Sequence, residues 1–248
     1  MSTKNLTRDF PMQKEFLGDK KMNDIIYGFL QTNSYLTPTK KRYCWRSEVT
    51  AGKIIEYFKE QETESPIAER TIRNLLKLFA KINLLEEGEY EGKKVYYLPD
   101  ITANYVIIKT ETLRFLVNTA NTNVIKVYAQ LKKMWECHKK YQHKEKYRFS
   151  KADLLTAIGY KTTKSYSENF KMIEDILQCL QNNELIEIHK EGIVTGSGQA
   201  TEYYELDCVN DDYRKTLSSK AKEDNTVCVY PVAETPVVYH REHKEFIF

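Results

Sequence analysis

The segment 70–81 carries basic and amide-bearing side chains on one side of an expected helix. At about 100° per residue, the polar side chains that fall together are Arg70, Thr71, Arg73, Asn74 and Lys77. Ile72, Leu75 and Phe79 fall on the opposite side and predict a buried face. Guanidinium and amide groups hydrogen-bond the edges of bases, and ammonium groups neutralise phosphates. The same pattern also suits a helix whose outward face is merely solvated.

Further basic residues surround this segment in the chain. Arg42 and Arg46 precede an expected helix at 49–59, and Lys93 and Lys94 lie in an expected hairpin. Cations at such positions are suited to contact phosphates. We therefore add these four residues to the candidate DNA-binding set.

A second basic set lies in the other half of the chain. Lys126, Lys133 and Lys140 recur every seven residues, opposite apolar residues that include Val127 and Leu131. The segment 126–151 holds nine basic residues and two acidic ones, although the whole chain has a net charge of only +3. This helix either grips a duplex backbone or is simply solvated.

The start of the expected helix 166–182 offers another set of candidate contacts. They are Lys161, Lys164, Ser165 and Tyr166. A helix N-terminus carries partial positive charge and attracts phosphate. Further along, the outward side of this helix includes Glu168 and Asp175, which phosphate would repel. We therefore do not expect this helix to enter a groove deeply.

The chain repeats itself. Residues 72–86 align without a gap to residues 173–187, and a Tyr-Tyr pair follows each copy after a polar stretch that contains Gly. Both copies combine helical apolar spacing with the start of a short strand. An internal repeat of this length predicts two copies of one structural unit.

The expected elements have the same order in both units. The first unit has helices at 22–31, 49–59 and from about Ser65, with strands at 84–86 and 95–98. The second follows a strand at 105–108; its expected elements are helices at 124–141, 151–158 and 166–182 and strands at 185–188 and 201–206. We predict an α+β fold, mainly α, with two tandem winged helix-turn-helix domains and an extended C-terminal tail. The expected divisions are a flexible arm at 1–18, domains at 19–101 and 102–210, and a connector and tail at 211–248.

The sequence offers little for catalysis, metal binding or membrane insertion. The five cysteines are scattered without a Cys-x-x-Cys pair, and no nucleophile, metalloprotease or nucleotide-binding fingerprint is present. No apolar run approaches the roughly 20 residues that span a bilayer. We therefore predict a cytoplasmic protein that is not an enzyme and uses no metal or cofactor.

The order of elements resembles that of a known group. Between residues 105 and 187, a strand and a long helix are followed by "FSKADLLTAIGY" and by a helix that runs into "LIEI". This order resembles the winged-helix domains of plasmid and phage replication initiators and related primosome proteins, and residues 22–100 resemble a second such domain. The resemblance implies recognition of repeated origin sites, recruitment of host replication proteins and self-regulation.

The leading hypothesis is a sequence-specific double-stranded DNA-binding protein, a replication initiator of a plasmid, phage or mobile element. A homodimer is compatible with it. One alternative is a transcriptional regulator on the same fold. Another is a scaffold whose winged helices bind proteins and whose basic faces are only solvated.

Overall fold

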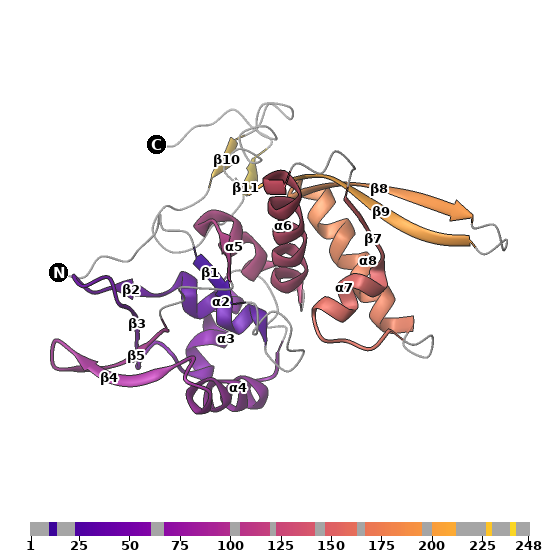
Figure 1. Cartoon of the computed structure of the whole chain (residues 1–248). Helices are drawn as coiled ribbons and strands as arrows, with labels where there is room; N and C mark the ends of the chain where they lie inside the picture. Colours follow the sequence, from indigo (N-terminus) through magenta and orange to yellow (C-terminus); the bar gives the residue numbers. More distant parts are fainter. Residues whose placement is uncertain are drawn as a thin grey trace.

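A computed structural model shows a mixed α+β fold built from helices and small antiparallel sheets (Figure 1). The α+β class expected from the sequence is confirmed. The structure describes residues 10–13, 23–60, 67–99, 105–119, 123–141, 147–162, 167–194, 200–211, 227–229 and 239–241. Among the described helices, none combines the length and apolar character that crossing a bilayer requires.

The first unit joins three helices to a four-stranded sheet. Its elements are α2 (Asp24–Thr32), β2 (Tyr35–Leu36), β3 (Arg42–Trp45), α3 (Ala51–Glu60), α4 (Glu69–Lys81), β4 (Glu86–Tyr90) and β5 (Lys93–Tyr97). The sheet order is β2-β3-β5-β4, and Tyr43 pairs with Tyr97. Strand β3, which the sequence did not predict, therefore joins the hairpin to the strand that follows α2.

The second unit follows the same order of elements with one strand fewer between its first two helices. Its elements are α6 (Val124–Tyr141), β7 (Tyr147–Phe149), α7 (Lys151–Ala157), α8 (Ser167–Asn182), β8 (Ile186–Val194) and β9 (Ala200–Val209). The sheet order is β7-β9-β8, so the strand before the second helix again pairs with the last strand. The β8–β9 hairpin is longer than expected, because β8 continues past Gly192.

The repeat extends to the backbone at the end of the third helix. Asn83 and Glu184, one in each unit, have positive φ angles of 59° and 57°. In each case the next residue donates a hydrogen bond back to the helix, from Leu84 N to Phe79 O at 2.8 Å and from Leu185 N to Leu180 O at 2.9 Å. This is the left-handed C-cap that turns a helix into the following strand.

Helix starts agree with the sequence in one unit and differ in the other. Ser150 caps α7 through a reciprocal capping box with Asp153, as its position predicted. Helix α4 begins at Glu69, later than expected, because its first turn closes on Ala68, whose carbonyl accepts from Thr71 N and Ile72 N.

A single hydrophobic core is continuous through both units. Helix α2 packs against α6 and against α5 (Thr110–Asn118), which the sequence did not predict. At Gly28 of α2 a Cβ atom would lie only 2.8 Å from Ile125 Cδ1 and from Val117 Cγ2. The absence of a side chain at Gly28 therefore allows the first helix of one unit to lie against the first helix of the other.

Short strand pairs lie at both ends of the chain. Strand β1 (Phe10–Gln13) pairs with β6 (Tyr105–Ile108), so part of the segment expected to be a flexible arm is held by a sheet. Near the C-terminus, β10 (Val227–Val229) pairs with β11 (Tyr239–Arg241), a region the sequence predicted to be extended.

Candidate nucleic-acid interface

Helix α4 presents its polar side to solvent. All five candidate residues on it are exposed: Arg70, Thr71, Arg73, Asn74 and Lys77. Ile72 and Phe79 are fully buried on the opposite side. The apolar spacing sets this orientation, because the buried stripe must face the core.

One acidic residue, Glu69, also lies on the exposed side of α4. Glu69 forms an ion pair with Arg73 one turn later, and both side chains are largely exposed. An exposed pair of this kind contributes little to stability, so the guanidinium can give up the carboxylate for another anion. Arg73 therefore remains available to a phosphate or a base edge.

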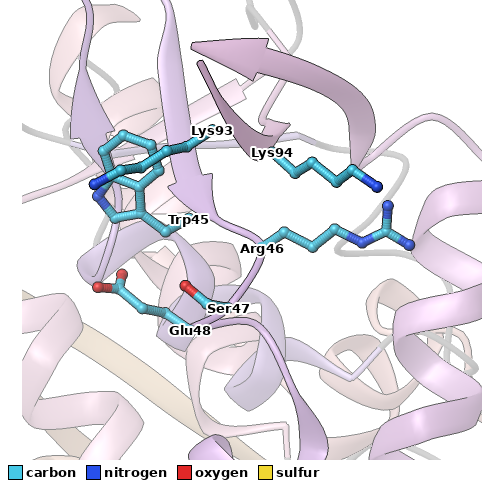
Figure 2. Close-up of a pocket in the computed structure, with 6 residues that line it drawn as sticks. All are labelled: Trp45, Arg46, Ser47, Glu48, Lys93 and Lys94. Atoms are coloured by element: carbon cyan, nitrogen blue, oxygen red, sulfur yellow. The ribbon is translucent and has the colours of Figure 1, made fainter. Parts of the chain in front are cut away.

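Three further cations gather where β3 meets the β4–β5 hairpin. Arg46, Lys93 and Lys94 are exposed and line a hollow of about 630 Å³ together with Trp45, Ser47 and Glu48 (Figure 2). The backbone holds two of the cations together, because Arg46 N donates a 3.1 Å hydrogen bond to Lys94 O. Of the residues that the structure describes, three cations and one carboxylate thus line the hollow.

Arg42 does not belong to this surface. It is half-buried, and its guanidinium donates a 2.7 Å hydrogen bond to Ser34 Oγ. It also lies near the buried Tyr27: burial raises the pKa of Tyr27 to about 12, and the charge of Arg42 partly opposes that rise. The two arginines differ in position, because Arg42 is the first residue of β3 and contacts Ser34, whereas Arg46 follows the last residue of the strand, Trp45.

The sequence pattern wrongly predicted that Lys126 is exposed. It is fully buried rather than exposed on a basic stripe. Helix α6 is covered by α2, α5, α7 and α8, so the side expected to face solvent faces other helices. The apolar spacing predicted that only one side of α6 is buried, whereas in the structure other helices pack on more than one side of α6.

The remaining candidates of the second unit are not brought into one surface by the described residues. Lys133 is half-buried and Lys161 is exposed. The side chain of Lys140 and residues Lys164, Ser165 and Tyr166 lie outside the described residues.

A neighbouring lysine of α6 acts within the fold. Lys132 Nζ lies 2.7 Å from Asp211 Oδ2, and Tyr128 donates a hydrogen bond to Asp211 Oδ1. Burial, with the Asp211 charge nearby, raises the pKa of Tyr128 well above its ordinary value. Asp211 thus ties the end of the second unit to α6.

The candidate residues predicted from the sequence do not include the aromatic residues of the first sheet. Tyr43 packs at 5.1 Å from Trp45 and at 4.9 Å from Tyr90, measured between ring centroids. Lys41 Nζ lies 4.1 Å from the centroid of Tyr97, and Lys93 Nζ lies 5.5 Å from that of Trp45. The two-residue spacing of Tyr43 and Trp45 is the signal that could have revealed them, because it places both rings on one face of a strand.

Within the described ranges, no group of three or more His, Cys, Asp or Glu side chains could hold a metal ion. No protein-family model, curated protein or solved structure matches the chain. The functional argument therefore rests on the surfaces of the protein itself.

Proposed function

We propose that the chain is a non-enzymatic, sequence-specific double-stranded DNA-binding protein built from two winged helix-turn-helix units. In each unit the strand before the second helix pairs with the hairpin that follows the third helix, and this order supports the assignment. The third helix of such a unit is the one that enters a major groove. In the first unit that helix is α4.

The exposed face of α4 carries this proposal. It combines guanidinium, amide and ammonium groups over two turns, a set that suits both base edges and phosphates. Figure 1 shows α4 and the β4–β5 hairpin at one end of the molecule, away from α8. The cations Arg46, Lys93 and Lys94 would contact phosphates beside the groove that α4 enters.

The second unit is the weaker candidate for groove entry. In the aligned repeat, Arg73 and Asn74 of α4 correspond to Glu174 and Asp175 of α8, which are exposed. Glu174 lies 3.1 Å from Lys151 of α7. Two carboxylates at these positions would repel the backbone of a duplex, so the second unit would support or position the first.

Within this class, the resemblance in the order of elements favours a replication initiator of a plasmid, phage or mobile element, which would act in the cytoplasm with host replication proteins and without a membrane. A homodimer would place two copies of α4 on repeated or palindromic sites. A transcriptional regulator would use the same surface and is the alternative. A scaffold that binds only proteins would leave the face of α4 without a nucleic-acid partner.

The test is selection of duplexes from a random pool, followed by salt titration on the selected site. We expect a repeated or palindromic motif, and an affinity that falls with salt at a slope near −0.9 for each phosphate neutralised. Arg73→Ala should cost about 1–3 kcal/mol at that site if Arg73 contacts a base.

The matched control is Lys171→Ala, which removes an exposed cation of α8 at the position equivalent to Arg70. It should leave duplex affinity nearly unchanged. No enriched sequence, or equal and negligible losses in both variants, would contradict the proposal. Binding to a protein partner that does not depend on salt would instead favour the scaffold.

A further inference from the structure

The sheet of the first unit has one face turned away from the helices. Cys44 in the middle of β3 is buried and donates a hydrogen bond from Sγ to Leu30 O of α2 at 3.3 Å. Residues on either side of it in a strand point the opposite way. Tyr43 and Trp45 therefore lie on the outer face, together with Tyr97, which pairs with Tyr43.

Aromatic rings cover this outer face. The rings come from Tyr35, Tyr43, Trp45, Tyr90 and Tyr97, with neighbouring centroids between 4.9 and 6.4 Å apart. Tyr43 is fully buried beneath the others, which are only half-buried. Gly88 leaves room for the Tyr97 ring, since a Cβ there would lie 2.5 Å from a ring atom. The result is an aromatic cluster whose rings are tilted against one another and whose outer rings are partly exposed.

Cations border these rings, most densely at Trp45. Figure 2 shows the Lys93 side chain running along the Trp45 ring, with Arg46 and Lys94 side by side on the other side of the same hollow. The Arg46 guanidinium forms an exposed pair with Glu87 at 3.3 Å and lies over the Tyr96 ring. Among the described residues of the lining, Glu48 is the one carboxylate. The described lining of the hollow beside Trp45 therefore holds more cations than carboxylates, which favours an anionic occupant.

Aromatic rings beside cations suit an anion that itself has flat faces. In a duplex the bases are stacked on each other and cannot reach a ring on a sheet, whereas the bases of a single strand can. We propose that this outer face and the adjoining hollow bind single-stranded DNA. A base stacks on Trp45, and phosphates are held by Lys93 on the same face and by Arg46 and Lys94, which line the hollow from the opposite side of the sheet. The inference shares these three cations with the proposed function but adds a second kind of nucleic acid, held by rings that α4 does not contain.

The fluorescence of Trp45 provides a direct test. The chain has two tryptophans, so Trp135→Phe leaves Trp45 as the sole reporter in the full-length protein. The probe is an oligo(dT) of about ten nucleotides, within the range of single-strand site sizes. We expect quenching of Trp45 on binding and an affinity that falls with salt, at a slope of about −0.7 for each phosphate neutralised.

Two variants separate stacking from charge, and both are measured by the fluorescence anisotropy of a labelled oligo(dT). Trp45→Ala should weaken binding by about five- to 150-fold, the range for loss of one base-stacking ring. Lys93→Gln/Lys94→Gln alters only exposed side chains, so it should keep the fold and still weaken binding. Lys171→Gln is the control and should have no effect. Circular dichroism confirms that each variant is folded.

The outcomes distinguish this inference from the proposed function. Arg73→Ala should reduce duplex affinity and leave the oligo(dT) titration unchanged. Absence of Trp45 quenching, or unchanged oligo(dT) affinity in folded Lys93→Gln/Lys94→Gln, overturns the single-strand site even if duplex binding persists. Tighter binding of oligo(rU) than of oligo(dT) also overturns it, because the occupant would then be RNA.

Discussion

The carboxylate of Asp24 in α2 accepts a 3.1 Å hydrogen bond from the backbone N–H of Lys126 in the first turn of α6. It accepts another, of 3.2 Å, from the N–H of Asn123. Asp24 and Lys126 are both fully buried. Burial raises the pKa of Asp24, while the Lys126 charge and these N–H groups oppose the rise. Asp24 therefore caps a helix of the other unit and shares a buried environment with its lysine.

Lys126→Met should destabilise the protein at neutral pH by about 3–5 kcal/mol, the usual cost of leaving one buried charge without its counter-charge. Without Lys126, the pKa of Asp24 should rise further. When a carboxyl group has a higher pKa in the folded state than in the unfolded state, the folded protein loses stability as pH rises through the folded-state pKa. The loss in Lys126→Met should thus be small below the ordinary pKa of 3.8 and grow toward neutral pH. Urea unfolding at several pH values measures it.

The double variant Asp24→Asn/Lys126→Met is the control for this pH dependence. It removes both charges, so the extra slope between acidic and neutral pH should disappear. A Lys126→Met protein whose unfolding free energy follows that of the parent at every pH would show that the two charges do not interact.

Gly28→Ala and Gly52→Ala form a matched pair in helices. At Gly28 the new methyl group would meet Ile125 and Val117 at 2.8 Å, so overpacking should cost about 1–3 kcal/mol. At Gly52, exposed on α3, nothing lies within 4 Å of the new methyl group, and Ala should stabilise by about 0.4–1 kcal/mol. Opposite signs in thermal or urea unfolding are expected; destabilisation of similar size at both sites would contradict the close approach of α2 and α6.

Glu184→Gly tests the left-handed cap after α8. A residue with a side chain pays about 1–2 kcal/mol in this conformation, so Gly at a φ of 57° should raise the unfolding free energy by about 1 kcal/mol. Asn83→Gly should gain less, because Asn tolerates a positive φ better than Glu. Urea unfolding compares them, and a loss of stability in both variants would argue against the shared cap.

Arg42→Ala and Arg46→Ala separate a structural cation from a binding one. Loss of the Arg42 bond to Ser34 should lower stability by about 1 kcal/mol or more and leave the salt dependence of DNA binding unchanged. Loss of exposed Arg46 should reduce the salt slope by about one unit with little change in stability. A lower salt slope in Arg42→Ala with unchanged stability would instead show that Arg42 contacts DNA.

Much of the fold could be predicted from local patterns. The apolar spacing at Ile72, Leu75 and Phe79 predicted both α4 and its buried side, and the aligned segments predicted that α8 would follow the same course. Ser150 was recognisable as a cap because capping depends on neighbours three residues away. The outward direction of Arg73 followed from the same periodicity.

Contacts between distant segments could not be predicted in this way. Strand β3 has only four residues, and its pairing with β5 depends on residues about fifty positions away. Helix α5 carries no repeat signal, yet it packs on α2. Lys126 is buried by helices of both units, and no short segment of sequence around Lys126 contains those helices.

The sequence by itself determined which residues share a helix face and that the unit occurs twice, because helix periodicity and repeats are local properties. Only the tertiary structure decided that Lys126 and Arg42 leave the cationic surface and that Trp45 joins Lys93 and Lys94 beside a hollow. The physical reason is that burial and charge pairing depend on which segments meet in space, and the spacing of residues along one segment does not specify its neighbours.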